Sequence, residues 1–159
     1  MTVRLFSEEE LDELRVSPKR LTNPGSRWTG KPTEAPVHRQ RSFKATGEDA
    51  AGTRFDIYQR QNLLDEADFS SGIALVSVDG SRLTLARYNG PSHEHGDISY
   101  RPHIHRANAE SIATGGKPER HAEETDRFVT LEGAFACLLE DFNIAGISAT
   151  HDGQRALPL

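Results

Sequence analysis

Cysteine is almost absent from this sequence, because Cys137 is the only one among 159 residues. An intrachain disulfide is therefore excluded, and so is a zinc site built on several thiolates. Cys137 lies in the apolar segment GAFACLLEDF, which predicts a buried side chain rather than a nucleophile. A chain of this length buries roughly two-thirds of the surface that it exposes when unfolded, so it needs neither a disulfide nor a metal to fold.

Long apolar runs are also missing. No stretch of 18 apolar residues occurs, so the sequence predicts no membrane-spanning helix. The opening residues, MTVRLFSEEELDEL, lack the apolar core and cleavage-site pattern of a signal peptide. We therefore expect a cytoplasmic protein with no membrane partner. The length suits one compact unit and no repeat divides it, which predicts a single domain over residues 1–159.

Basic residues are in the minority, and the formal net charge is −5. This balance argues against a general nucleic-acid coat protein, whose surface would be basic overall. The charge is uneven, however, because residues 82–106 contain four arginines and two acids, a local charge of +2. The remainder of the chain must then carry −7, since the total is −5. Such a patch suits a phosphate-bearing substrate, although ordinary scatter of charge explains it equally well.

Alternation of apolar and polar residues predicts strands in the middle of the chain. The segments that show it are 38–47, 53–61, 72–78, 82–88 and 100–107. In the second of them, Phe55 and Ile57 point to one face. Asp56, Tyr58 and Arg60 therefore point to the other.

Turn and loop signals connect these strands. Asp79-Gly80 is the dipeptide favoured in type I′ hairpin turns, so a hairpin is predicted there. The segment IALVSV before it is nearly continuous in apolar character, which predicts a central strand buried on both faces. The polar segment KPERHAEETDRF, residues 117–128, predicts a loop.

Helices are predicted towards the two ends of the sequence. Ser7 and Glu10 form a capping-box pattern in FSEEELDELR, and Thr130 caps an apolar helix that follows it. Four prolines and two glycines in residues 17–37 predict an extended arm, pinned to the body by Trp28, and the tail at 150–159 is expected to fray. The predicted fold class is α+β: an antiparallel sheet of four to six strands, with the N-terminal and C-terminal helices packed on one face.

Histidine is concentrated in one short stretch. Four of the seven histidines lie in residues 87–105, RYNGPSHEHGDISYRPHIH, as two His-x-His pairs. On a strand, His103 and His105 would point to one face while Ile104 points to the core. His93 and His95 precede that strand by one short loop. All four imidazoles converge if the strands before and after this loop are neighbours.

Two kinds of chemistry fit such a cluster. In the first, imidazoles bind Zn²⁺ or another divalent transition metal that activates water. In the second, one histidine acts as base and another as acid across a phosphodiester, which suits a group whose pKa is ordinarily near 6.5. The candidate residues for both are His93, His95, His103 and His105. The alternative is a solvated polar face without a function.

The order Arg-Tyr-Asn-Gly-Pro-x-His-x-His, followed by Arg-Pro-His-x-His, resembles a pattern in small bacterial proteins of the TumE-like toxin group and related uncharacterised families. The matching residues are Arg87, Tyr88, Asn89, His93, His95, Pro102, His103 and His105. Asn89 stands where those families carry an acid, and Ile104 stands where they carry another histidine. The resemblance covers about residues 85–106. It implies a toxin of a gene pair, with an antitoxin partner and RNA as its substrate.

The favoured hypothesis is a toxin-type phosphodiesterase or ribonuclease with histidine acid–base or metal-assisted chemistry. Its candidate substrate-binding residues are Arg87, Tyr88, Asn89, Arg101 and Arg106. One alternative is a divalent-metal enzyme whose substrate is not nucleic acid. The other is a non-enzymatic binding protein, such as an antitoxin, an immunity factor or a phage accessory protein, whose arm at 17–37 wraps a partner.

Overall fold

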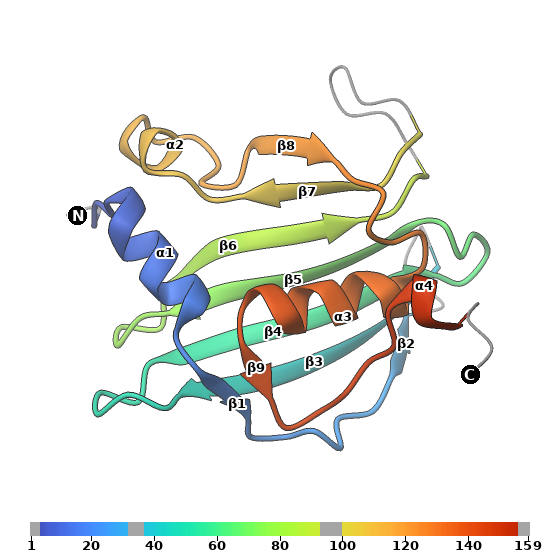
Figure 1. The fold of residues 1–159 in the computed structure, drawn as a ribbon, viewed down its shortest axis with the longest axis horizontal. Coiled ribbons are helices and arrows are strands. Elements are labelled where there is room, and N and C mark those ends of the chain that lie inside the picture. Colours follow the sequence, from blue (N-terminus) through green and yellow to red (C-terminus); the bar gives the residue numbers. More distant parts are fainter. Residues whose placement is uncertain (1–3, 32–36, 93–99, 156–159) are drawn as a thin grey trace.

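A curved nine-stranded sheet dominates the computed structural model, which describes residues 4–31, 37–92 and 100–155 (Figure 1). The strands are β1 (Lys19–Leu21), β2 (Thr29–Lys31), β3 (His38–Gly47), β4 (Arg54–Asn62), β5 (Phe69–Val76), β6 (Arg82–Asn89), β7 (His103–Arg106), β8 (His121–Glu124) and β9 (Ile144–Ala145). The helices are α1 (Glu8–Val16), α2 (Ala109–Ala113), α3 (Leu131–Asp141) and α4 (Asp152–Arg155).

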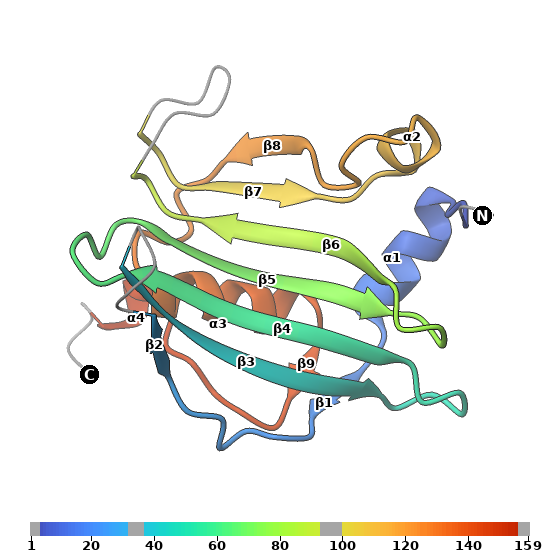
Figure 2. The ribbon, with the colours of Figure 1, turned by 180° about the vertical axis from the view of Figure 1, so that it is seen from behind.

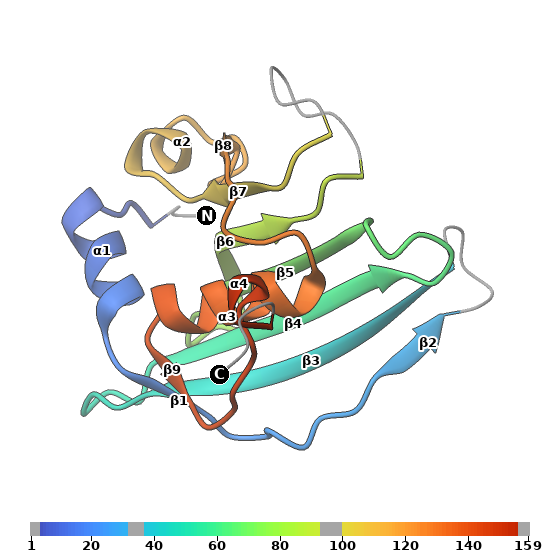
Figure 3. The ribbon, with the colours of Figure 1, turned by 45° about the vertical axis from the view of Figure 1, so that its right-hand side comes forward.

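The strand order across the sheet is β8-β7-β6-β5-β4-β3-β1-β9, and β2 also pairs with β3. Strands β3 to β8 follow one another as antiparallel neighbours. Strands β1 and β9 pair in parallel, so the sheet is mixed. The sheet curves around α3, which lies along its hollow side (Figure 3).

The two faces of the sheet differ in what covers them. We name the face under α3 the inner face. Alternate side chains of the central strands point into it and are buried, as period-two alternation requires: Phe43, Ala45, Phe55, Ile57, Ile73, Leu75, Tyr88 and Ile104. The ring of Phe43 stacks on that of Phe135 from α3, with the centroids 5.6 Å apart. The opposite, outer face has no described helix across it (Figure 2).

Both predicted helix starts are confirmed. The Ser7 side chain accepts a hydrogen bond from the backbone N–H of Glu10, and the Glu10 carboxylate accepts one from the backbone N–H of Ser7, which completes the capping box. At α3, the Thr130 hydroxyl accepts a hydrogen bond from the backbone N–H of Gly133. Asp152 of the C-terminal segment adds contacts to Val129 and Thr130, so the chain end is tied to the start of α3.

The hairpin at Asp79-Gly80 is confirmed, but its turn type is not the predicted one. Gly80 has a φ of +88°, whereas Asp79 is not among the described residues with positive φ. A type I′ turn requires positive φ at both positions. The Asp79 carboxylate instead accepts hydrogen bonds from the backbone N–H and the hydroxyl of Ser81, which stabilises the turn.

The arm at 17–37 is docked on the sheet where the structure describes it. Its strands β1 and β2 both pair with β3. Trp28 packs against the core, and the guanidinium carbon of Arg39 lies 4.0 Å from the centroid of its ring. The prediction that Trp28 pins the arm is confirmed. In the tail at 150–159, α4 lies within the described residues, and residues 156–159 lie outside them.

The predicted fold class is wrong. Instead of an antiparallel sheet of four to six strands with two terminal helices on one face, the chain forms a nine-stranded mixed sheet, and α3 is the helix that packs across it. The additional strands β1, β2, β8 and β9 have two to four residues each. Such short segments carry little alternation of their own, and their backbone pairing depends on a longer neighbouring strand.

Candidate functional site

Two rows of polar side chains cross the outer face of the sheet. Successive register partners in the first row are Tyr58, Gly72, Arg87 and His105. Those in the second row are Arg60, Ser70, Asn89 and His103. Directly opposite residues share a face, so both rows point away from α3. Ile104 points the other way and is 3% exposed, which confirms the predicted orientation of His103-x-His105.

A polar cavity of about 260 Å³ opens among these rows. Its lining residues are His38, Tyr58, Arg60, Asn62, Asp68, Phe69, Ser70, Arg87 and Asn89. Arg60 forms no ion pair or hydrogen bond through its side chain with another described residue, so its guanidinium group is available to a ligand. Two arginines at one small cavity make it a site for an anion.

A chain of hydrogen bonds orders the floor of the cavity. The Ser70 hydroxyl donates to Asn89 Oδ1 at 2.7 Å, and the Tyr58 hydroxyl lies 3.0 Å from Ser70 Oγ. Since Asn89 Oδ1 is an acceptor in this chain, the amide nitrogen of Asn89 is the group that can donate to a bound anion. On the far wall, Asp68 accepts hydrogen bonds from Asn62 at 3.2 Å and from Ser92 at 3.3 Å.

Glu119 connects Arg87 with His105. Its carboxylate oxygen Oε2 lies 2.9 Å from Arg87 Nε, and its backbone carbonyl lies 2.9 Å from His105 Nδ1. The contact with Arg87 is an ion pair rather than an aligned hydrogen bond. Glu119 is itself 6% exposed, so the pair lies in a medium that screens it weakly. This contact limits the positions that the Arg87 side chain can take.

Both imidazoles of the strand pair are held by backbone carbonyl groups. His103 Nδ1 lies 3.0 Å from the carbonyl oxygen of Arg101, and His105 Nδ1 makes the corresponding contact with Glu119. A carbonyl oxygen can only accept, so each Nδ1 carries a proton, and Nε2 is the acceptor nitrogen of the neutral ring. The ring centroids are 5.2 Å apart, in an edge-to-face arrangement. The pair therefore offers two oriented imidazoles, and the Nε2 atom of His103 is shielded from solvent.

The other predicted site residues do not all lie at this site. Arg101 contributes its carbonyl oxygen, while its side chain is exposed. Arg106 lies on the inner face of β7, where it approaches Glu123 at 3.9 Å. His93 and His95 lie outside the described residues, and with them the predicted convergence of four imidazoles.

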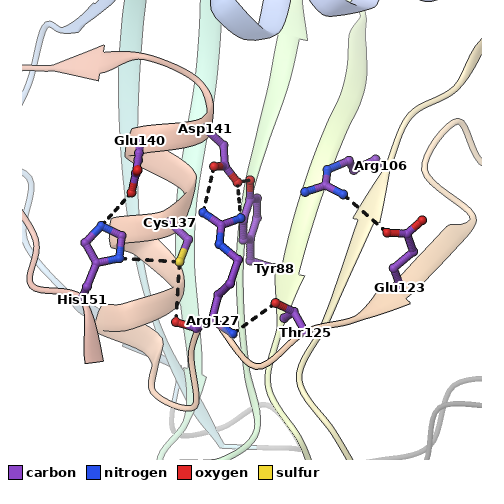
Figure 4. A network of polar contacts seen from close by, with 9 residues as sticks. All are labelled: Tyr88, Arg106, Glu123, Thr125, Arg127, Cys137, Glu140, Asp141 and His151. Carbon is purple, nitrogen blue, oxygen red and sulfur yellow. Dashed lines mark hydrogen bonds and ion pairs between the residues drawn. The ribbon is translucent and has the colours of Figure 1, made fainter. Parts of the chain in front are cut away.

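Tyr88 lies on the inner face, away from its sequence neighbours Arg87 and Asn89. Its hydroxyl donates to Asp141 Oδ2 at 2.6 Å, and both terminal nitrogens of Arg127 bind the same carboxylate at 2.9 Å (Figure 4). Burial and the neighbouring Asp141 raise the pKa of the Tyr88 phenol far above its ordinary value. The Tyr88 hydroxyl therefore serves to attach α3 to the sheet.

Cys137 also belongs to this inner network. Its sulfur lies 3.8 Å from His151 Nδ1, and His151 Nε2 lies 2.9 Å from Glu140 Oε2 (Figure 4). The order thiol, imidazole, carboxylate matches that of a nucleophilic triad. However, Cys137 is 1% exposed, and burial raises the pKa of its thiol. A protonated, buried thiol is not a nucleophile, in agreement with the sequence-based prediction of a buried side chain.

Sequence reasoning missed several residues of the cavity. His38, Asn62, Asp68 and Ser70 carry no motif, and Glu119 lies in a segment predicted to be a loop without a role. Tyr58 and Arg60 could have been found, because the alternation in residues 53–61 places them together on the polar face. The sequence did not show that Tyr58 and Arg60 share this face with residues of β6 and β7.

Among the described residues, no group of three or more His, Cys, Asp and Glu side chains is arranged to hold a metal ion. No helix in the described part of the chain has the length and apolar character needed to cross a membrane. No family model, curated protein or solved structure matches the chain. The resemblance to TumE-like toxins therefore stays a prediction.

Replacing Gly72 with alanine is expected to deform this cavity. A Cβ atom at Gly72 would lie 2.5 Å from the Tyr58 ring, so the ring must swing away and lose its contact with Ser70. We expect a loss of about 1 kcal/mol in stability, from one hydrogen bond and part of the ring packing. Urea denaturation checks this, with Gly25→Ala as the matched control, since nothing lies within 4 Å of that position. Equal stability of both variants would mean that the ring does not rest on Gly72.

Proposed function

We propose that this protein is a phosphodiesterase of the ribonuclease type, with RNA as its substrate and the outer-face site as its catalytic centre. The observation that carries the proposal is the register of β6 and β7, which pairs Arg87 with His105 and Asn89 with His103. A cation and an amide donor thus line one polar cavity, and each has an imidazole of β7 as its register partner. Such side chains can supply the charge stabilisation and the proton transfers of phosphodiester cleavage.

In the proposed reaction, the substrate phosphate binds in the cavity, where Arg60 and Arg87 neutralise its charge. One imidazole of the His103–His105 pair removes the proton from the ribose 2′-hydroxyl, and the 2′ oxygen attacks phosphorus. The other imidazole begins the reaction as the imidazolium, and it donates its Nε2 proton to the departing 5′ oxygen as the bond between phosphorus and that oxygen breaks. The products are a 2′,3′-cyclic phosphate and a 5′-hydroxyl. Exchange of protons with solvent restores both rings.

A partner and a location belong to the same proposal. The resemblance to TumE-like toxins supports a cytoplasmic protein whose activity a cognate antitoxin blocks. A partner that covers the outer face would block the cavity directly, since no described helix shields it.

A non-enzymatic binding protein is the second candidate, and the burial of both imidazoles favours it. His103 is 1% exposed and His105 is 2% exposed, and each ring is held by a backbone carbonyl. Histidines in such positions can serve to order β7 and the loop that carries Glu119. The cavity would then bind an anion without converting it.

Cleavage of a fluorescently labelled oligouridylate in the presence of a chelator tests the proposal. The wild type is expected to produce fragments with 2′,3′-cyclic ends, and His105→Ala to lower the rate about a hundredfold, since it removes a general acid or base. His105→Gln is the second variant, because its amide can keep a hydrogen bond to Glu119. His121→Ala is the matched control, since His121 is an exposed histidine of β8.

Three results would decide between the readings. Cleavage that survives in both His105 variants excludes the acid–base role. Cleavage that appears only when a divalent metal replaces the chelator supports the metal-assisted mechanism instead of metal-free acid–base catalysis. Binding of the oligonucleotide without cleavage under either condition supports the second candidate.

A further inference from the structure

The outer face of the sheet is strongly basic, although the chain as a whole has a net charge of −5. Outward-pointing positions of β1 and β3–β6 carry six basic side chains and one acidic one, a formal charge of +5. The basic residues are Arg20, Lys44, Arg54, Arg60, Arg82 and Arg87, and the acid is Asp56. The inner-face positions of the same strands carry three basic side chains, Lys19, Arg39 and Arg41, but these are buried or half-buried. Most basic side chains of the outer face are exposed, which is typical of a surface that contacts a polyanion.

Three of the arginines form a row at the end of the sheet far from the cavity. The successive register partners of this far row are Arg20, Thr46, Arg54, Val76 and Arg82. Neighbouring arginines in the row are two strands apart, which is roughly 10 Å at about 4.8 Å per strand. The row therefore presents positive charge across most of the width of the sheet.

The far row is open to solvent. Arg20 approaches Glu48 at 3.7 Å and Arg82 approaches Asp56 at 2.6 Å, but the side chains of both arginines are more than 60% exposed, at 63% and 64%. Exposed ion pairs of this kind contribute little to stability, so each arginine can readily exchange its carboxylate partner for another anion. Arg54 forms no ion pair or hydrogen bond through its side chain with another described residue. Its guanidinium group is available to a ligand.

The far row and the cavity are separated by the length of β4. Arg54 begins this strand and Arg60 lies six residues later, so they are about 20 Å apart at roughly 3.3 Å per residue. Lys44 lies on the same face, opposite Asp56, the second residue after Arg54 in β4. One phosphate in the cavity cannot contact the far row, whereas a strand of several nucleotides can contact both.

We infer that the outer face binds a single strand of RNA along β4, with one phosphate in the cavity and phosphates further along the strand on the far row. The inference rests on the proposed function, because it extends that substrate from one phosphodiester to a strand. The far row binds the substrate and takes no part in the chemical step. Contacts to backbone phosphates carry no base specificity, so the protein holds strands of different sequence.

Fluorescence anisotropy with a labelled twelve-residue oligouridylate tests the inference. Arg54→Glu is expected to raise the dissociation constant about tenfold and to lower the salt dependence by about one phosphate contact. Arg4→Glu is the matched control, because Arg4 is an exposed arginine that lines a recess beside α1, with the inner-face residues Phe55 and Leu75. It is expected to change the affinity less than twofold.

Cleavage of the dinucleotide UpU separates this inference from the proposed function. UpU has one phosphate, so Arg54→Glu should leave its cleavage unchanged. If UpU is cleaved and Arg54→Glu has the affinity of the wild type for the twelve-residue strand, the inference fails and the proposed function stands. If nothing is cleaved but Arg54→Glu weakens binding tenfold, the inference stands and the catalytic proposal fails. Equal affinity for a duplex of the same length would also overturn the choice of a single strand.

Discussion

Replacement of Lys19 by methionine is expected to lower the free energy of unfolding by about 3 kcal/mol, a factor of more than a hundred in the folding equilibrium. Lys19 is 1% exposed, and its Nζ donates to three backbone carbonyls. These belong to Arg15 at 3.2 Å, Ser17 at 2.8 Å and Phe142 at 2.8 Å. Methionine fills a similar volume, but it leaves all three acceptors without this donor, and the bond to Phe142 is buried.

The position of Lys19 explains why its loss has so large an effect. Helix α1 ends at Val16 and α3 ends at Asp141, so the ammonium group lies at two helix C-termini. Carbonyl groups at a helix C-terminus have no partner within the helix and carry partial negative charge. One side chain on β1 thus caps two helices and ties both of them to the sheet.

The stability that Lys19 contributes is expected to rise with pH. Burial, together with the nearby charge of Arg15, lowers the pKa of Lys19 to about 8 in the folded protein. An unfolded lysine keeps its proton up to about pH 10.4. Between these values the unfolded state binds more protons, so the stability of the wild type rises with pH in that window. The difference from Lys19→Met should therefore be larger at pH 10 than at pH 7.5.

Urea denaturation of both proteins at these two pH values checks the prediction. Lys44→Met is the matched control, since Lys44 lies on the exposed face of the neighbouring strand β3. We expect Lys44→Met to change the free energy of unfolding by less than 0.5 kcal/mol, as for ordinary surface substitutions. A loss of similar size for both lysines, at either pH, would show that the buried Lys19 side chain does not tie the helix ends.

Asp141→Ala is also expected to lower the free energy of unfolding by about 3 kcal/mol. The Asp141 carboxylate accepts hydrogen bonds from the Tyr88 hydroxyl and from both terminal nitrogens of Arg127. Tyr88 is 0% exposed, and without Asp141 its hydroxyl loses its hydrogen-bond acceptor in the folded state. An unsatisfied buried hydroxyl and the loss of a bidentate ion pair together account for the expected size.

This contribution should become smaller in acid. Burial alone would raise the pKa of Asp141, but the hydrogen bonds from Arg127 and Tyr88 outweigh it and hold the pKa below its ordinary value. Since the folded pKa is the lower one, the stabilisation is complete above about pH 4 and is lost as the pH falls through the folded pKa. The difference in stability between wild type and Asp141→Ala should therefore narrow there.

Chemical denaturation between pH 7 and pH 2.5 measures this narrowing. Tyr88→Phe is the companion variant, because it removes one hydrogen bond and leaves the ion pair with Arg127. Tyr88→Phe is expected to lower the free energy of unfolding by about 1 kcal/mol. If Tyr88→Phe is as unstable as Asp141→Ala, the bond from the Tyr88 hydroxyl accounts for the whole loss, and the ion pair of Asp141 with Arg127 contributes nothing to stability.

Much of the local structure could be predicted from the sequence. The caps at Ser7 and Thr130 depend on side chains within three residues of the helix start, and the hairpin at Asp79-Gly80 depends on two adjacent residues. The alternation that places Phe55 and Ile57 opposite Tyr58 and Arg60 is equally local. Such features arise from interactions between near neighbours in the chain, which a sequence displays directly.

The extent of the sheet could not be predicted in the same way. Strand β8 has the polar sequence HAEE, with two of its four side chains acidic. It is a strand because β7 offers it a row of backbone donors and acceptors. Strands β1 and β9 meet although more than a hundred residues separate them, with Lys19 opposite Ile144. Such long-range pairings depend on the tertiary fold, which places the two segments next to each other.

The candidate site depends on one irregularity that the sequence did not reveal. Leu83 and Leu85 alternate with polar or small residues, and a regular continuation of that strand would turn Arg87 towards the core. The register between β5 and β6 shifts at Ile73 and Ala74, however, which reverses the alternation beyond Leu85.

By itself, the sequence determined that His103 and His105 share a face with Ile104 opposite, that Cys137 is buried, and where two helices begin. Only the tertiary structure decided that Arg87 and Asn89 join those histidines while Tyr88 turns inward, and that a basic outer face extends away from them. The physical reason is that side-chain alternation is a local property, whereas its phase relative to a neighbouring strand is set by pairing. A shift of one residue moves every later side chain to the other face.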